Sequence, residues 1–387
     1  MVYSLQADFS KSDQIPGGSA LLCASVNERR AQFGESGRFS CQQDGEEASP
    51  RAADGNKDGV TRVAEEFYHL SVLEDEVLQL MAVTEGEVVF DGTLGGGGHS
   101  ERLLAAGARV IACDRDPAAL AFACERLAAY GDQFKAYHGN YDQMDQLLAG
   151  AGEEAGVDGI LLDLGISSKH VDDAERGFSF AKDGPLDMRM DSTADLTAEI
   201  LVNEGGEDEL RRILWDFGEE RSARAVVRAM VAARELGRIE TTGQLAALVE
   251  SVIPRRGKRH PATKVFQALR MAVNDELGHL QKALEKSVNC LKPGGRLAII
   301  SFHSLEDRIV KRFLRQHSMA MLDRPEWPEP KPNPECYFSL PVRKPYAPGA
   351  SELENNPRAR SAKLRIAIRL ESDGGDLEKR NKNRYAK

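Results

Sequence analysis

The sequence of 387 residues has little of what builds metal, disulfide or membrane scaffolds. Its six cysteines are scattered and none forms a C-x-x-C pair, which argues against a zinc site and a disulfide framework and fits a reducing cytoplasm. No apolar run approaches the roughly 20 residues of a membrane-spanning helix. The amino terminus lacks the basic-then-apolar pattern of a signal peptide. The sequence therefore predicts a cytoplasmic protein with no metal ion and no membrane partner.

Positive charge is also scarce, since 51 Lys and Arg face 61 Asp and Glu and the formal net charge is -10. Such a chain cannot bind nucleic acid through its overall charge, so any RNA contact must come from a local basic surface. The hydrophobic fraction of 41% is ordinary for a globular protein. The length is sufficient for two domains.

The two ends of the chain differ in pattern from the rest. Residues 1–66 are rich in Gly, Ser, Asp and Glu without sustained periodicity, and we predict that they form a disordered extension. Organelle transit peptides are poor in acidic residues, so the acidic residues between 44 and 58 disfavour that alternative. Residues 372–387 are predicted to form a charged tail.

Alternating strands and helices begin after the extension. They are predicted, in order, over residues 87–93, 100–106, 109–114, 117–129, 134–138 and 159–164. Apolar strands that alternate with helices indicate a parallel sheet with helices on both faces. This pattern occupies residues 67–165 and resumes over 274–371, where 295–302 form a further strand and 362–370 have the alternation of an edge strand. We therefore predict a discontinuous, doubly wound, Rossmann-like α/β domain.

Residues 166–273, between these two segments, show no convincing strand pattern. Apolar residues at helical spacing follow one another instead, and Gly218 ends the first group. Thr242 is placed to cap a later helix, which Pro254 ends. The sequence thus predicts an all-helical domain inserted into the α/β domain.

A glycine-rich turn, DGTLGGGGH from Asp91 to His99, follows the first predicted strand. Glycines there let the backbone approach a ligand at the carboxyl ends of the strands. Asp114 ends the second strand, where an acidic residue binds ribose hydroxyls in nucleotide-type cofactors. The turn departs from G-x-G-x-x-G because Ser100 replaces the third glycine. These features suit NAD as well as S-adenosylmethionine, and a tight turn without a ligand is the third interpretation.

Two further features separate these interpretations. Asp163 ends the fourth strand beside the point where the strand order reverses, and the turn KPGG at residues 292–295 precedes the fifth strand. That turn is common in methyltransferases and is not expected in dehydrogenases. The sequence therefore favours an S-adenosylmethionine-dependent methyltransferase over a nicotinamide-dependent dehydrogenase. The intact glycines, Asp114 and Asp163 also speak against a non-catalytic RNA-binding protein of ribosome assembly with a degenerate cofactor site.

Long stretches of the chain carry a family resemblance. They span about residues 68 to 370 and include DGTLGGGGHS, DRDPAAL, GILLDLGISS, DDAERGFSFAKDGPLDMRMD, HPATKVFQALRMAVNDEL and LKPGGRLAIISFHSLEDRIVKRF. In these stretches the chain resembles the RsmH (MraW) family, the bacterial cytosine-N4 methyltransferases of small-subunit ribosomal RNA. The resemblance implies a class I methyltransferase domain, a helical insert that recognises the substrate, and S-adenosylmethionine as cofactor. It also implies a cytidine of 16S-type rRNA, within the small ribosomal subunit, as substrate.

The resemblance further implies a set of cofactor contacts. They fall on Gly97, Gly98, His99, Asp114, Tyr141, Asp163 and His170. Tyr141 stands where Phe is frequent in the family and keeps an aromatic face for adenine. His170 stands where Gln is common and adds a titratable group.

Asp163 and His303 are the candidates for catalysis. Methyl transfer to a cytidine N4 amine depends mainly on alignment, and an oxygen that accepts an N4 hydrogen would help to localise the lone pair. Many DNA amino-methyltransferases place an Asp/Asn-Pro-Pro-aromatic turn after the fourth strand, whereas this chain has DLGI and keeps only the carboxylate. Asp163 therefore orients the amine, contacts the cofactor, or does both. His303 ends the fifth strand region before Ser304, the predicted cap of the next helix, and is either catalytic or structural.

RNA contacts are expected on aromatic and basic side chains near this site. Phe178 and Phe180 follow the fourth strand and either stack on a splayed-out base or pack the insert onto the core. From Arg221 to Arg270 there are eleven Arg and Lys against three acidic residues. The alternative for any such charge run is a solvated face. The basic candidates are Arg255, Arg256, Lys258 and Arg259 in one loop and Arg308 on a later helix.

Overall fold

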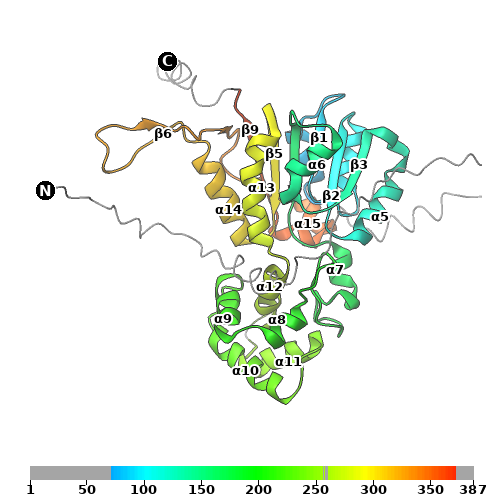
Figure 1. The fold of residues 1–387 in the computed structure, drawn as a ribbon, viewed down its shortest axis with the longest axis vertical. Coiled ribbons are helices and arrows are strands. Elements are labelled where there is room, and N and C mark those ends of the chain that lie inside the picture. Colours follow the sequence, from blue (N-terminus) through cyan, green and yellow to red (C-terminus); the bar gives the residue numbers. More distant parts are fainter. Residues whose placement is uncertain (1–70, 256, 258–259, 372–387) are drawn as a thin grey trace, which may run out of the picture.

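The computed structural model describes residues 71–255, 257 and 260–371. The predictions for the amino-terminal extension, the charged tail, Arg256, Lys258 and Arg259 lie outside the described residues. Figure 1 shows two parts, a sheet covered by helices and, below it in this view, a group of helices.

Seven strands form one sheet in the order β3-β2-β1-β4-β5-β9-β8. The five strands from β3 to β5 in this order run parallel to one another, whereas β9 runs antiparallel to both β5 and β8. The strands are β1 (Val88–Asp91), β2 (Arg109–Asp114), β3 (Phe134–His138), β4 (Val157–Asp163), β5 (Leu291–Ser301), β8 (Phe338–Ser339) and β9 (Lys363–Arg369). The doubly wound, mostly parallel sheet predicted from the sequence is confirmed.

β9 is not the edge strand that its alternating pattern predicts. Phe338 of β8 pairs with Arg369 at the carboxyl end of β9, and Tyr346 bridges to Leu364 near its start. Alternation reports which face of a strand is buried and carries no information on its outer neighbour. Because β8 has two residues, it leaves no pattern of its own in the sequence.

Helices cover both faces of the sheet (Figure 1). One face carries α3 (Glu74–Met81), α4 (Gly98–Ala105) and α5 (Pro117–Arg126). The other face carries α6 (Met144–Ala151), α13 (Glu276–Cys290) and α14 (Ser304–Gln316), and α15 (Ala350–Asn355) precedes β9 in the chain. Neighbouring residues of β1 show how the strands serve both layers, because Val89 is buried in the first core and Phe90 in the second.

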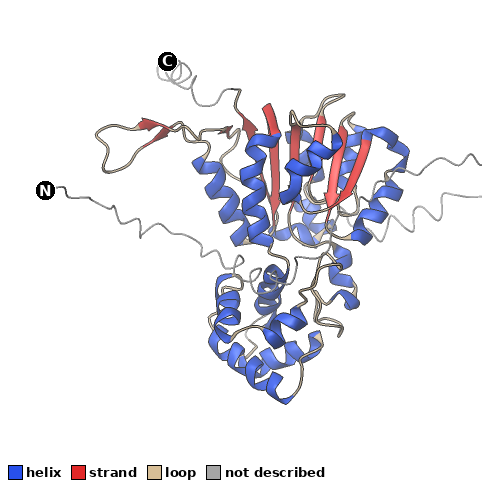
Figure 2. Cartoon of the chain, in the orientation of Figure 1, coloured by secondary structure: helices blue, strands red, loops and turns tan. Residues whose placement is uncertain are grey.

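The chain between β4 and α13 forms helices with a core of their own. They are α7 (Ser168–Asp172), α8 (Ala198–Glu204), α9 (Glu207–Asp216), α10 (Ala223–Leu236), α11 (Thr242–Val252) and α12 (Ala262–Val273). Leu214, Val227 and Leu269 are fully buried within this core. No described residue between β4 and β5 belongs to a strand, as Figure 2 shows.

Two helices start one residue earlier than predicted. Thr241 rather than Thr242 caps α11, because its backbone is extended and its hydroxyl accepts a backbone N–H of the first turn. His303 rather than Ser304 caps α14, and its Nδ1 accepts the Glu306 N–H at 3.3 Å. The last extended residue before the first helical turn makes the cap, and neighbouring polar residues cannot be separated by sequence alone.

The KPGG turn lies within the bounds of β5 rather than before it. Gly294 has a φ of 80°, in the left-handed region that favours glycine. The pairing of β4 with β5 shifts register between Val157 and Gly159, beside this turn. The turn is therefore a glycine bulge at the start of the strand.

Two exclusions made from the sequence can be compared with the structure. No helix in the described ranges is long and apolar enough to cross a membrane. Cys113, Cys290 and Cys336 are free thiols.

Candidate active site

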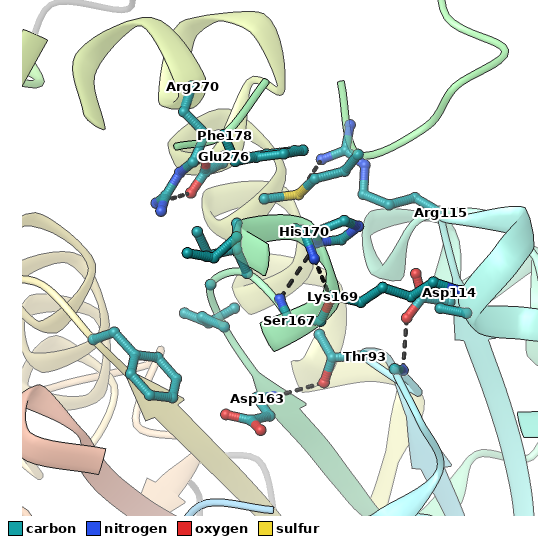
Figure 3. Close-up of a pocket in the computed structure, with 18 of the residues that line it drawn as sticks. Thr93, Asp114, Arg115, Asp163, Ser167, Lys169, His170, Phe178, Arg270 and Glu276 are labelled. Atoms are coloured by element: carbon teal, nitrogen blue, oxygen red, sulfur yellow. Dashed lines mark hydrogen bonds and ion pairs between the residues drawn. The ribbon is translucent and has the colours of Figure 1, made fainter. Parts of the chain in front are cut away.

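A cavity of about 580 Å³ opens where the carboxyl ends of β1, β2 and β4 meet the helical part (Figure 3). Phe266 and Arg270 of α12 form part of the wall opposite the sheet. Ligands of doubly wound proteins bind at this end of the sheet. The cavity is lined by the following predicted residues: Gly98, His99, Asp114, Tyr141, Asp163, His170, Phe178, Phe180 and His303. Gly97 lies next to them in the chain and does not line the cavity itself.

The loop after β1 requires glycine at two points. Gly92 has no space for a side chain, because a Cβ there would lie 2.5 Å from Leu162 Cδ2 and 2.6 Å from Tyr141 Cβ. Gly97 has a φ of 80° and directly precedes α4. The loop thereby brings bare backbone and the first turn of α4, with its unpaired N–H groups, to the cavity.

Asp114 ties this loop to the end of β2. Its Oδ2 accepts the Gly95 N–H at 2.7 Å, and its Oδ1 accepts the Asp116 N–H at 2.8 Å. Burial raises the pKa of the Asp114 carboxyl, although both N–H groups favour the charged form. Each carboxylate oxygen keeps a second lone pair. Asp114 can therefore still accept a hydroxyl of a ribose-containing ligand.

Asp163 lies beside the buried His99 at the end of β4. Asp163 Oδ2 lies 3.4 Å from His99 Nε2, and the Asp163 N–H donates to Thr93 Oγ1 at 2.7 Å. Burial alone would lower the pKa of His99, but the carboxylates of Asp163, Asp91 and Glu74 together outweigh burial and the pKa is raised. Asp163 Oδ1 and both His99 ring nitrogens are buried without a hydrogen-bond partner among the described residues. Such atoms are rare in proteins and fit a polar ligand that would complete them.

His170 lines the cavity with both ring nitrogens engaged by the protein. Its Nδ1 accepts the Ser167 N–H at 3.3 Å, and its Nε2 lies 2.6 Å from Asp116 Oδ2. Its ring stacks on Phe178 with 4.9 Å between centroids. Burial would raise the pKa of Asp116, but hydrogen bonds from His170 and Arg176 outweigh it and lower the pKa. A ligand can therefore meet His170 through its ring carbons, beside Phe178.

Glu276, His303 and Glu306 bring a nitrogen and two carboxylates within 4.8 Å of one another, as a divalent metal site would. Both oxygens of Glu276, however, accept hydrogen bonds from Arg270, at 2.7 and 2.8 Å. His303 Nδ1 accepts a backbone N–H, so the proton of the neutral ring sits on Nε2, 3.1 Å from Glu306 Oε1. A metal ion would require that nitrogen without its proton. The cluster is therefore an ion-pair network in the cavity wall, in which His303 Nε2 is buried without a hydrogen-bond partner among the described residues.

The other predicted RNA residues lie in different surroundings. Phe180 reaches the cavity but packs edge-on against Phe266, with centroids 4.8 Å apart. Arg255 is exposed. Arg308 Nη2 lies 3.4 Å from Glu219 Oε1 on the surface. Neither of these arginines lines the cavity.

Neither the Arg270–Glu276 pair nor Arg115 is predicted from the sequence. The side chains of Arg270 and Glu276 are 14% and 7% exposed. They meet across the turn between α12 and α13, where Asp275 has a φ of 44°. An ion pair across such a turn has no characteristic spacing. Arg115 donates to the Asn274 carbonyl at 3.0 Å and lines the same cavity, as Figure 3 shows.

Comparison with known proteins adds to this geometry. The MraW methylase family matches residues 66–370 of the chain. A ribosomal RNA small subunit methyltransferase H from Paenibacillus sp. is 47% identical over 315 residues, which are 79% of this chain and 100% of that relative. One from Geobacter sulfurreducens is 47% identical over 316 residues, covering 79% of this chain and 99% of the relative. The chain belongs to the MraW methylase family.

This membership decides among the functions that the sequence left open. The protein is a methyltransferase with S-adenosylmethionine as its methyl donor, so the dehydrogenase and the non-catalytic alternatives are wrong. A solved structure of an rRNA methylase from Streptococcus thermophilus is 13% identical with a TM-score of 0.34, covering 77% of this chain and 93% of that chain. That likeness is too weak to carry an argument, and the assignment rests on the family.

Proposed function

We propose that the protein methylates the N4 amine of a cytidine in the RNA of the small ribosomal subunit. Its family relatives at 44–48% identity are small-subunit ribosomal RNA methyltransferases. The choice of an amine as the methyl acceptor is supported by Asp163 at the end of β4. One oxygen of its carboxylate is buried and has no hydrogen-bond partner among the described residues. A carboxylate so placed can accept a hydrogen from an amine in the cavity.

The proposed cofactor contacts follow the cavity wall. S-adenosylmethionine, when bound, supplies an electrophilic sulfonium methyl group. Asp114 would accept its ribose hydroxyls and Tyr141 would offer an aromatic face to its adenine. The remaining contacts are proposed on Gly97, Gly98, His99, Asp163 and His170, the last through its ring carbons.

The reaction places two demands on the protein. The N4 lone pair of cytidine is conjugated with the ring, which makes the amine a weak nucleophile, so its alignment with the methyl group provides most of the catalysis. We propose that Asp163 Oδ1 accepts an N4 hydrogen, localises the lone pair and takes the proton released after transfer. His99 Nε2 lies 3.4 Å from Oδ2 and holds the other oxygen of the carboxylate in place.

We also propose a division of labour between the two parts of the chain. Residues 67–165 and 274–371 form the methyltransferase domain, and residues 166–273 recognise the substrate. A base in structured RNA must leave its stack to reach a cavity at the end of a sheet. Phe178 lies in the cavity wall and is 8% exposed, so it would meet the base at its edge. His303 acts as a positioning residue that fixes the start of α14 beside the cavity.

Replacement of Asp163 tests the proposal. Asp163→Asn should lower the single-turnover rate of methyl transfer to small ribosomal subunits by about 10²–10⁴, the usual contribution of a positioned proton acceptor. Affinity for S-adenosylmethionine should change far less. Asp145→Asn is the matched control, because Asp145 pairs with Lys286 on the surface away from the cavity. A normal rate for Asp163→Asn, or a labelled methyl group mapped to an atom other than cytidine N4, would refute the proposal.

A further inference from the structure

The two tryptophans of the chain have opposite surroundings. Trp327 lies in the hairpin formed by β6 (Met321–Leu322) and β7 (Lys331–Pro332). The Arg324 guanidinium and the Lys331 ammonium lie 5.0 and 4.9 Å from the centre of its ring. Trp215, on the last turn of α9, is 59% exposed and makes no ring contact or hydrogen bond within the described part of the chain. An exposed indole of this kind is a common anchor for a binding partner.

Arginines surround Trp215. A shallow cavity of about 370 Å³ is formed by Arg211, Arg212, Trp215, Arg221, Ala223 and Arg224. We call the four arginines and Trp215 the arginine–tryptophan surface. Arg211 pairs with Asp208 at 2.8 Å, and Arg212 donates to the Asp208 carbonyl at 3.4 Å and interacts with the Asp216 carboxylate. No ion pair joins Arg221 or Arg224 to any described residue. The surface thus combines positive charge that is only partly compensated with an exposed aromatic face on an otherwise acidic protein.

This surface is connected to the candidate active site. Glu219 lies between α9 and α10 and meets Arg308 of α14 at 3.4 Å. The cap of α14, His303, lines the active-site cavity. Figure 1 shows α9 and α14 on the same side of the molecule. The Glu219–Arg308 contact therefore joins the segment that follows Trp215 to the helix that begins at the cavity.

We propose that the arginine–tryptophan surface binds a single-stranded segment of the substrate RNA, with one base stacked on Trp215 and neighbouring phosphates held by Arg212, Arg221 and Arg224. Alternation of aromatic rings and guanidinium groups is the arrangement that single-stranded nucleic acid requires, because bases stack and phosphates accept bidentate hydrogen bonds. The proposal rests on the proposed function for the identity of the RNA, and its contact is independent of base sequence.

Tryptophan fluorescence tests the contact directly. In Trp327→Phe, Trp215 is the sole tryptophan, and oligocytidylate at low salt should quench its emission as a base stacks on the ring. In Trp215→Phe, the remaining Trp327 should keep its emission unchanged. Absence of quenching in the first variant would overturn the proposal.

Enzyme kinetics with small ribosomal subunits test its role. Trp215→Ala should raise KM about five- to 150-fold, the usual loss for one stacked base, with the single-turnover rate at saturation and the affinity for S-adenosylmethionine unchanged. Trp327→Ala is the matched control and should leave KM unchanged. Arg212→Gln with Arg224→Gln should reduce the slope of log affinity for oligocytidylate against log salt by about 0.7 for each lost phosphate contact. This pair also tests the surface if Trp215→Ala fails to fold.

The outcomes separate this inference from the proposed function. If the wild type methylates no ribosomal RNA, the proposed function fails, while the fluorescence and salt experiments still decide whether the surface binds RNA. If the wild type is active but KM and salt slope are unchanged in all variants, the inference fails alone. A raised KM without quenching by oligocytidylate would assign the surface to a ribosomal protein and overturn the proposal.

Discussion

Removal of the carboxylate of Glu276 should destabilise the protein strongly. Glu276 opens α13 and accepts two hydrogen bonds from Arg270, the fourth residue from the end of α12, at 2.7 and 2.8 Å. The two side chains are 14% and 7% exposed, so solvent screens the pair little. Without Glu276, the Arg270 guanidinium stays buried beside the cavity, and Glu306 is the other carboxylate that interacts with it. The pair thus joins the end of α12 to the start of α13.

The size of the effect follows from this burial. Breaking a buried pair by removing one partner costs about 3–5 kcal/mol of unfolding free energy, because the other charge is left uncompensated. Glu276→Ala should reach this range. Glu276→Gln should fall near its lower end, since the amide oxygen can keep one of the two bonds. Arg270→Met with Glu276→Leu removes both charges and should recover most of the loss, giving a coupling free energy of about 2–3 kcal/mol.

Urea unfolding followed by circular dichroism measures these values if the slope against urea is unchanged. Arg238→Gln is the control, because it breaks a pair with Glu199 whose arginine is 48% exposed. Its unfolding midpoint should match that of the wild type. Additive single substitutions, with no coupling between the two positions, would refute the argument. So would a Glu276→Ala variant as stable as the control.

Three further predictions concern the cavity. Asp114→Ala should weaken S-adenosylmethionine binding by about 1.5–3 kcal/mol through the loss of charge-assisted hydrogen bonds, and unchanged affinity in calorimetry would contradict this assignment. Gly92→Ala should lower the unfolding free energy by about 1–3 kcal/mol, because its Cβ would overlap Leu162; a neutral result would mean that the loop moves without cost. Hydrogen bonds from His170 and Arg176 lower the pKa of Asp116 in the folded protein below its ordinary value of 3.8. The ionised carboxylate therefore stabilises the folded protein above pH 3.8, and this stabilisation is lost as the pH falls through the pKa of the folded state. Asp116→Asn should therefore flatten the acid limb of unfolding free energy against pH, and a limb as steep as that of the wild type would contradict this.

The sheet was largely predictable because its strands are buried on both faces. The predicted ranges of β2 and β3 coincide with the observed bounds, since each is a short apolar run between turn residues. The interior place of β9 was not predictable, because its outer neighbour is two residues long. Thr241 and His303 were missed as caps because the adjacent residue is also polar, and the backbone angles decide which of the two accepts the N–H.

The site residues that stand at the carboxyl ends of strands were predictable from the sequence. Asp114 and Asp163 were found because each ends a parallel strand at the same edge of the sheet. The side-chain pairs of the site were not predictable. The contact of Asp163 with His99 and that of Arg270 with Glu276 each join residues from separate elements. Trp215 was also missed, since a single aromatic residue on a helix normally indicates core packing.

The place of β9 has a consequence for the order in which the protein can be completed during synthesis. β9 pairs with β5 from Arg296 to Ser301 and is the last strand of the described chain, although it lies inside the sheet. Until it leaves the ribosome, the outer edge of β5 has unpaired N–H and C=O groups beside buried apolar residues. An open edge of that kind is a template for pairing with another chain. The nascent protein is therefore most prone to aggregate in the interval between the synthesis of β5 and that of β9. A pause of the ribosome in that part of the mRNA would lower the yield of folded enzyme.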